Sequence, residues 1–161
     1  MQFHDIKPGM VIEGGPRLVT EDEIIAFASR YDPQWFHVDP ERAARGRWKT
    51  LIASGWHTAA ISMELMFKHI LLGSSSFGSP GLENLRWPAP VRPGDSLSLR
   101  CNVLKTGISA SGRTGSVVWT WELRNQDGLQ VLEVTGTSLF SLHDLPAPGV
   151  LSTPQPRAGE T

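Results

Sequence analysis

The chain has 161 residues, with 15 Lys and Arg against 16 Asp and Glu and a formal net charge of −1 at pH 7. This balance, without any Lys/Arg-rich run, argues against a basic surface for nucleic acid or anionic membranes and favours a small-molecule partner. Cys101 is the single cysteine, so no intrachain disulfide can form. Because the N-terminus lacks the basic start and apolar run of a signal peptide, we expect a cytoplasmic protein.

The first elements are a kinked strand and a capped helix. Residues 10–19 predict extended chain that Gly14-Gly15-Pro16 interrupts. Thr20 and Glu23 then have the spacing of a capping box, in which each residue's side chain accepts a hydrogen bond from the other's backbone N–H. Together with the apolar residues that follow, this pattern predicts a helix over residues 21–31.

Pro33 ends that helix, because proline has no N–H and disfavours the helical region for the residue before it. Asp32 is therefore expected where the helix becomes a loop. Asp39 and Pro40 repeat the start signal, as N-cap and first helical residue, and predict a short helix to about residue 45. His37 is expected in the loop between the two helices.

The rest of the chain predicts one long helix and then an antiparallel meander. From Gly55 to Leu72 the apolar residues nearly encircle the helix, which is typical of a buried helix, and Glu64 and Lys68 form an exposed i,i+4 pair. Strands are expected over residues 97–103, 117–123 and 129–142, with a hairpin turn at 125–128. This order indicates an α+β fold, with Trp119 and Trp121 packed on the central helix.

These patterns divide the chain into two segments. Residues 1–144 are expected to form a single domain. Residues 145–161 are rich in proline and carry no apolar pattern, so we expect a disordered C-terminal tail.

Asp32, His37 and Gly55 form the candidate catalytic set. Asp32 and His37 have the chemistry to share proton transfer, and the backbone N–H of Gly55, at the positive end of the central helix, can receive negative charge on a carbonyl oxygen. Such a set suits chemistry next to a thioester and needs no metal and no redox cofactor. The alternative is that Asp32 bonds nearby backbone groups, His37 is satisfied in its loop, and Gly55 only permits close packing.

The sequence resembles the MaoC-like dehydratases, which include the R-specific enoyl-CoA hydratases and have a hotdog fold, an antiparallel β-sheet wrapped around a long central α-helix. The segments that carry the resemblance are Phe27–Asp32, the step from Asp32 to His37, Leu51–Gly55, Gly81–Trp87 and Pro90–Asp95. In that family the pattern usually reads Asp-x-Asn-Pro-x-His and His-Gly. Here it reads Asp32-Pro33-Gln34-Trp35-Phe36-His37 and Ser54-Gly55, so the acid/base pair is kept while the Asn and the second His are absent.

Several neighbours are candidate substrate contacts. Gln34 is a hydrogen-bonding replacement for the missing Asn, and Ser54 is an N-cap rather than a nucleophile, because the Gly-x-Ser-x-Gly elbow is absent. Trp35 and Phe36 either line an acyl pocket or complete a core, and Trp56 is a further candidate substrate contact. Arg92 either meets phosphates of the carrier arm or is a solvated surface residue. His57 receives no role.

The resemblance implies a hydro-lyase acting as an (R)-specific enoyl-CoA hydratase or, in reverse, a 3-hydroxyacyl-thioester dehydratase. The expected partner is an acyl-CoA or acyl-carrier thioester. Hotdog proteins generally pair their sheets edge to edge, so a homodimer or higher homo-oligomer is expected. Two alternatives stay open: a thioesterase on the same scaffold, and a non-catalytic subunit that binds acyl thioesters.

Overall fold

The structure is a computed structural model, and it describes residues 1–143. The helices are α1 (Glu21–Tyr31), α2 (Trp35–Val38), α3 (Pro40–Arg45) and α4 (Gly55–Met66), with a 3₁₀ turn at Phe3–Asp5. The strands are β1 (Val11–Leu18), β2 (Ser76–Gly78), β3 (Leu82–Arg86), β4 (Ser96–Ile108), β5 (Thr114–Arg124) and β6 (Gln130–Ser141). The predicted tail, residues 145–161, lies outside the described residues.

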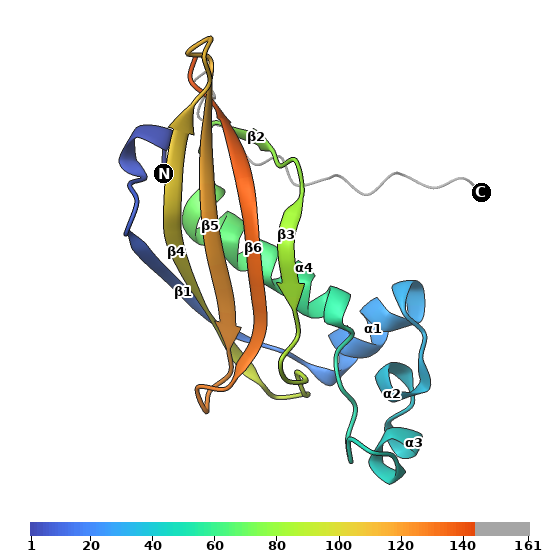
Figure 1. Cartoon of the computed structure of the whole chain (residues 1–161). Coiled ribbons are helices and arrows are strands. Elements are labelled where there is room, and N and C mark those ends of the chain that lie inside the picture. The colour runs from blue at the N-terminus through green and yellow to red at the C-terminus, as the bar shows by residue number, and fades with distance from the viewer. Residues whose placement is uncertain (144–161) are drawn as a thin grey trace, which may run out of the picture.

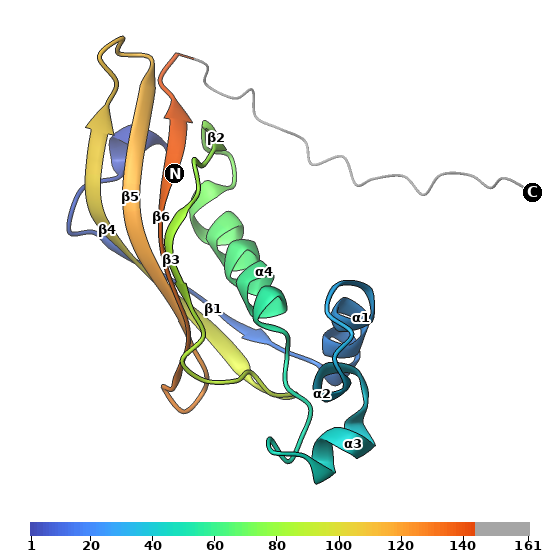
Figure 2. The ribbon, with the colours of Figure 1, turned by 45° about the vertical axis from the view of Figure 1, so that its right-hand side comes forward.

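One antiparallel sheet forms the frame of the described chain. Its strand order is β1-β4-β5-β6-β2, and β3 also pairs with β6. The sheet curves around α4, and α1, α2 and α3 lie beyond its end, next to the first turn of α4 (Figures 1 and 2). The expected arrangement of an antiparallel sheet around one long helix is confirmed.

The central helix begins as predicted and changes its winding near its end. Ser54 is the N-cap, and its Oγ accepts from the Trp56 N–H at 3.2 Å. The predicted pair is present, with Lys68 Nζ 2.5 Å from Glu64 Oε1. After Met66 the chain continues as a π-helical turn over Phe67–Leu71. The helix predicted over residues 55–72 is therefore an α-helix followed by a π-helical turn.

The kink predicted in the first strand is a bulge. The pairing of β1 with β4 shifts register between Gly14 and Arg17. A Cβ at Gly14 would lie 2.3 Å from Cδ2 of His69, so a side chain here would force the strand or the His69 ring to move. His69 also accepts a hydrogen bond from the Gly15 N–H at 3.2 Å.

Two local predictions were wrong or incomplete. His37 lies in the one-turn helix α2 rather than in a loop, because the His37 N–H donates to the Gln34 carbonyl at 2.8 Å and closes the turn. Strand β2 was not predicted, because its three residues give too short a pattern to recognise. The capped helix over residues 21–31 and the Asp39-capped helix α3 are both confirmed.

The core lies between α4 and the sheet. Trp119 and Trp121 are both buried, and Trp121 Nε1 donates to Ser62 Oγ of α4 at 3.3 Å. Cys101 is fully buried in the same core, and burial raises the pKa of its thiol to about 12, which keeps it protonated and unreactive. Within the part of the chain described here, no helix is long and apolar enough to cross a membrane.

His57 joins α4 to α1. Its ring stacks on Phe27, with centroids 4.7 Å apart and an angle of 11° between the planes. The side chain is buried and its Nδ1 has no hydrogen-bond partner among the described residues. Burial therefore lowers the pKa of His57, with the Glu23 carboxylate opposing the shift and Arg17 adding to it.

We expect this histidine to make stability depend on pH. As the pH falls below about 6.5, the unfolded chain takes up a proton at His57 that the folded chain resists, so the free energy of unfolding decreases. The His57→Gln variant should lose less stability than the wild type between pH 7.5 and pH 5.5, as measured by urea unfolding. The exposed His4→Gln variant should behave like the wild type, and equal pH dependence in all three proteins would contradict the assignment.

Candidate active site

A buried extended segment, residues 51–54, leads into α4 and holds the site together. All four residues are buried. Because buried backbone groups need partners, the two central residues of the segment bond to neighbouring segments. The Ile52 N–H donates to the Phe36 carbonyl at 3.1 Å, and the Ala53 N–H donates to the Val91 carbonyl at 2.8 Å. The segment thus ties α2 and the loop after β3 to the start of α4.

Asp32 lies at the C-terminal end of α1, and both of its carboxylate oxygens accept hydrogen bonds. Ser54 Oγ donates to Oδ2 at 2.7 Å, and Gln34 Nε2 donates to Oδ1 at 2.8 Å. The Ser54 hydrogen bond, followed by the Gln34 bond and the charge of His37, lowers the pKa of Asp32 against the opposing effect of burial. The carboxylate therefore stays ionised around neutral pH.

His37 is 4% exposed and is oriented by the backbone. Its Nδ1 lies 2.6 Å from the Ile52 carbonyl oxygen. Because a carbonyl only accepts hydrogen bonds, Nδ1 carries the proton, and Nε2 of the neutral ring has a free lone pair. Nε2 lies 3.4 Å from Asp32 Oδ2, so the carboxylate would stabilise a proton gained at Nε2.

Gly55 is the first residue of α4, where backbone N–H groups have no partner within the helix. No hydrogen bond found among residues 1–143 uses the Gly55 N–H. A Cβ at this position would lie 2.7 Å from Cε2 of Trp87, so the absence of a side chain lets the indole cover the helix start. The close-packing alternative and the donor hypothesis are thus compatible.

A cavity of about 260 Å³ brings these groups together. His37 and Gly55 both line it, with Trp48, Ile52, Ala53, Thr58 and the loop residues Trp87, Pro88, Ala89, Pro90 and Val91. Asp32 does not line the cavity and reaches it through His37. The arrangement offers a base, a carboxylate that holds the base's charge, and a backbone donor, which are the groups needed for proton transfer next to a carbonyl.

The other predicted substrate contacts lie in different places relative to the cavity. Gln34 and Ser54 touch Asp32, as described above. Trp35 and Phe36 are absent from the cavity lining: Trp35 packs on Gly46 and under Arg42, and Phe36 packs edge-on against the His37 ring. These two aromatics therefore support α2 and His37.

The other two predicted contacts lie at the rim. Trp56 is 61% exposed and packs edge-on against Trp87. Arg92 donates from Nη1 to the Trp48 carbonyl at 3.2 Å. Sequence reasoning missed Trp48, Thr58 and Trp87 as cavity residues. Of these, Trp87 was quoted within a family segment, and its contact with Gly55 is visible only in three dimensions.

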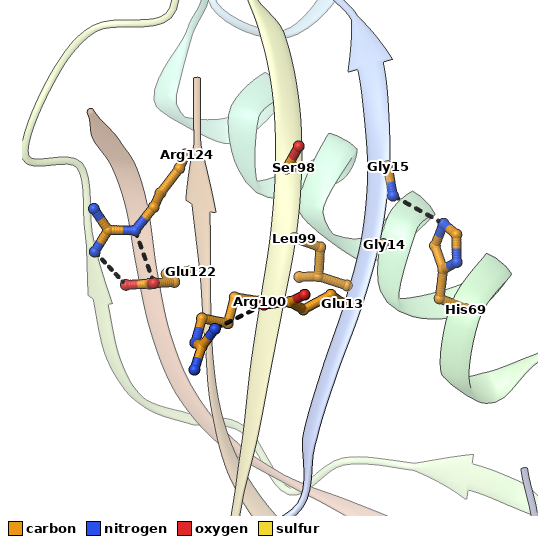
Figure 3. A pocket seen from close by; sticks show the side chains of 9 residues that line it. All are labelled: Glu13, Gly14, Gly15, His69, Ser98, Leu99, Arg100, Glu122 and Arg124. Atoms are coloured by element: carbon orange, nitrogen blue, oxygen red, sulfur yellow. Dashed lines mark hydrogen bonds and ion pairs between the residues drawn. The ribbon is translucent and has the colours of Figure 1, made fainter. Parts of the chain in front are cut away.

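A larger cavity of about 700 Å³ lies elsewhere, on the outer face of the sheet (Figure 3). Its charged side chains neutralise one another, with Arg100 2.7 Å from Glu13 and Arg124 2.9 Å from Glu122 (Figure 3). It contains neither Asp32 nor His37, so size alone does not identify the site. Across residues 1–143 no group of three or more His, Cys, Asp or Glu side chains could hold a metal ion.

Comparison with known proteins gives consistent results. The family model of the MaoC like domain matches residues 5–123. The chain is 34% identical over 104 residues to the 3-hydroxyacyl-thioester dehydratase Z of Mycobacterium tuberculosis, covering 63% of this chain and 69% of that protein. It is equally similar to the uncharacterised protein YdeM of Bacillus subtilis, covering 65% and 74%.

Solved structures are also similar to this chain. The MaoC-like dehydratase from Rhodospirillum rubrum superposes with a TM-score of 0.79 at 34% identity, covering 86% of this chain and 94% of that one. The R-hydratase PhaJ1 from Pseudomonas aeruginosa superposes with a TM-score of 0.69 at 21% identity, covering 94% and 96%, which shows the common fold.

Ser54 should have two separable effects. The Ser54→Ala variant loses the N-cap of α4, which costs about 1 kcal/mol of stability, and it removes the largest cause of the low pKa of Asp32. We expect the pKa of Asp32 to rise in this variant, measured by carbon NMR titration of its carboxyl group. The Thr20→Ala variant removes the N-cap of α1 at a similar cost. It should leave that pKa unchanged, and a shared shift would contradict a direct role of Ser54.

Proposed function

The chain belongs to the MaoC-like dehydratase family, and on this basis we propose that it adds water reversibly to a 2-enoyl thioester. The product is the (R)-3-hydroxyacyl thioester, and dehydration is the reverse reaction. The observation that carries the proposal is the placement of His37 and the Gly55 N–H on one cavity, with the Asp32 carboxylate 3.4 Å from His37 Nε2.

In the proposed mechanism, the His37/Asp32 pair activates one water molecule: Nε2 of His37 holds the water, and Asp32 acts on it through His37. As the water oxygen bonds to C3 of the substrate, Nε2 of His37 takes one of its protons, and the Asp32 carboxylate stabilises the resulting imidazolium. The electrons of the double bond move onto the thioester oxygen as an enolate. His37 then returns the proton to C2, so that one water is added in total.

The enolate oxygen is assigned to the Gly55 N–H. This donor is at the positive end of a 12-residue helix, and no other hydrogen bond of the described chain occupies it. Donors of this kind are worth on the order of 3–4 kcal/mol in the transition state. Trp87 and Trp48 border the same cavity and would limit access of bulk water to the developing charge.

A second cavity supports a hydrocarbon substrate. It measures about 400 Å³ and lies along the next turns of α4, where Ala59, Ser62, Met63 and Met66 line it. Leu82 and Leu85 of β3 form part of the opposite wall. Because Gly55 and Thr58 of the first cavity precede these residues on the same helix, an acyl chain whose carbonyl lies at Gly55 would extend into this apolar space.

We also propose that the functional form is a homodimer. Strands β2 and β3 pair only with β6, which leaves their outer edge without a neighbour within the described residues. Exposed apolar side chains are found on this side: Phe77, Leu82 and Trp87 on and after these strands, and Met63 on α4. A second copy pairing at this edge would cover both the open backbone groups and the apolar side chains.

The first experiment is to follow the loss of enoyl-thioester absorbance on a panel of trans-2-enoyl-CoAs, with a parallel assay for free thiol. We expect absorbance loss without thiol release. Asp32→Asn and His37→Ala should each lower kcat by at least about 100-fold, because general acid–base catalysis contributes roughly 10²–10⁴. Thiol release would assign a thioesterase, and turnover that is unchanged in both variants would reject the proposed pair.

The double role of Gly55 makes a second prediction. In Gly55→Ala the new Cβ meets the Trp87 ring, so the helix start or the indole must move and kcat should fall at least about tenfold. Adding Trp87→Ala removes the clash. The Gly55→Ala/Trp87→Ala variant should therefore show nearly the kcat of Trp87→Ala alone, whereas a tenfold loss that persists in this background would show that the clash is not the cause.

A further inference from the structure

Two side chains on the wall of the candidate active-site cavity can accept a hydrogen bond. Most of the residues that line this cavity are aliphatic or proline. Trp48 and Trp87 each carry an indole N–H, which only donates. Among the described residues of the wall, side-chain acceptors are thus found on His37, through Nε2, and on Thr58, through its hydroxyl. A water molecule that side chains hold in this cavity must use these two acceptors.

Thr58 lies one turn after Gly55 on α4 and is 2% exposed. Because the backbone of an α-helix lies inside its side chains, the side chain of Thr58 forms its part of the cavity wall. Oγ1 donates its one proton to the Ser54 carbonyl oxygen at 3.3 Å. No hydrogen bond found within residues 1–143 is accepted by this hydroxyl. Its lone pairs are therefore available to a molecule in the cavity.

The reacting water needs both acceptors. Water has two protons, and a buried polar group that lacks a hydrogen-bond partner is costly. In the proposed mechanism one proton moves to Nε2 of His37. Asp32 is not placed to accept the other, because it does not line the cavity and its two oxygens already accept from Gln34 and Ser54. The hydroxyl of Thr58 is the side-chain acceptor that is left.

We propose that Thr58 is the second contact of the reacting water and holds the 3-hydroxyl group of the product. This inference rests on the proposed function. As the water oxygen bonds to C3, its first proton moves to Nε2 of His37 and later to C2. Its second proton stays on the oxygen and is hydrogen-bonded to Thr58 Oγ1. Because both protons are directed at fixed acceptors, a lone pair of the oxygen can face C3. In dehydration the same hydrogen bond holds the 3-hydroxyl group until it leaves as water.

The hydroxyl of Thr58 also has a structural hydrogen bond, and substitutions can separate the two roles. The Thr58 backbone N–H donates to the Ser54 carbonyl at 3.0 Å, so this carbonyl keeps a partner when the hydroxyl is removed. Valine has the branched shape of threonine without the hydroxyl, and serine has the hydroxyl without the methyl group. Thr58→Val therefore removes the acceptor while the branched shape is kept, and Thr58→Ser keeps the acceptor while the methyl contact is lost.

The first test is the kinetics of hydration. In Thr58→Val we expect kcat to fall at least about tenfold, with KM for the enoyl thioester changed less than about twofold, because the thioester itself does not contact the hydroxyl. Thr58→Ser should regain most of the wild-type kcat. Thr120→Val is the matched control, because Thr120 lies on β5 and does not line this cavity.

Two kinetic results would overturn the proposal. One is an unchanged kcat in Thr58→Val, which would assign the second proton of the water to a backbone carbonyl. The other is an equal loss of kcat in Thr58→Val and Thr58→Ser, which would show that packing is the cause. Thermal unfolding checks that each variant is folded, and Thr58→Ala replaces Thr58→Val if the valine variant does not fold.

Binding measured by calorimetry tests the same contact without turnover. The probes are hexanoyl-CoA and (R)-3-hydroxyhexanoyl-CoA, which differ by the 3-hydroxyl group, and the His37→Ala background prevents reaction. On adding Thr58→Val to this background, we expect the affinity for the hydroxylated probe to fall at least about fivefold and that for hexanoyl-CoA to stay the same.

The outcomes separate this proposal from the proposed function. If the wild type hydrates no enoyl thioester while the binding difference is found, the proposed function is wrong and Thr58 still recognises a 3-hydroxyl group. If hydration is found while Thr58→Val changes the binding of both probes equally, or of neither, the proposal for Thr58 is overturned and the proposed function stands. If neither probe binds and no hydration is found, both are wrong.

Discussion

The site depends on the burial of one short extended segment, residues 51–54. A buried peptide unit without a hydrogen-bond partner is costly, so the backbone of this segment must be satisfied by its surroundings. The partners it uses are the Phe36 and Val91 carbonyls and, through the Ile52 carbonyl, Nδ1 of His37. The same requirement therefore fixes the tautomer of the proposed base, the position of α2 and the direction in which α4 begins.

The two residues that depart from the family pattern contact the same carboxylate. The chain lacks the Asn and the second His of the hydratase pattern, but Gln34 donates to one oxygen of Asp32 and Ser54 to the other. Both donors favour the ionised form of Asp32. The two donors come from different elements, an amide from the loop after α1 and a hydroxyl from the N-cap of α4. Ser54 also accepts from the Trp56 N–H, so helix capping and Asp32 orientation use one side chain.

Local sequence signals predicted the elements well where they were strong. The Thr20–Glu23 capping box, the stop at Pro33 and the Asp39-Pro40 start correspond to α1 and α3. Alternation predicted β4 and β5, and the hairpin turn placed β6 after them. The sequence brought Asp32, His37 and Gly55 together as a set. It could not show that Asp32 reaches the cavity only through His37, or that Trp35 supports α2 instead of lining a pocket, because those facts depend on packing between segments distant in sequence. Trp48 and Trp87 were missed as cavity residues for the same reason.

On the proposed function, successive turns of α4 would hold the reacting thioester and the acyl chain. Gly55 and Thr58 border the cavity with the proposed base, whereas Ala59 and the residues of the following turns border the apolar cavity against β3. A change at Met63 or Leu82 would alter the volume available to a hydrocarbon chain without touching Asp32, His37 or the helix start. Because a rigid helix and sheet hold these parts in a fixed order, each can vary while the proton-transfer geometry is kept, which is how one scaffold can serve several substrates.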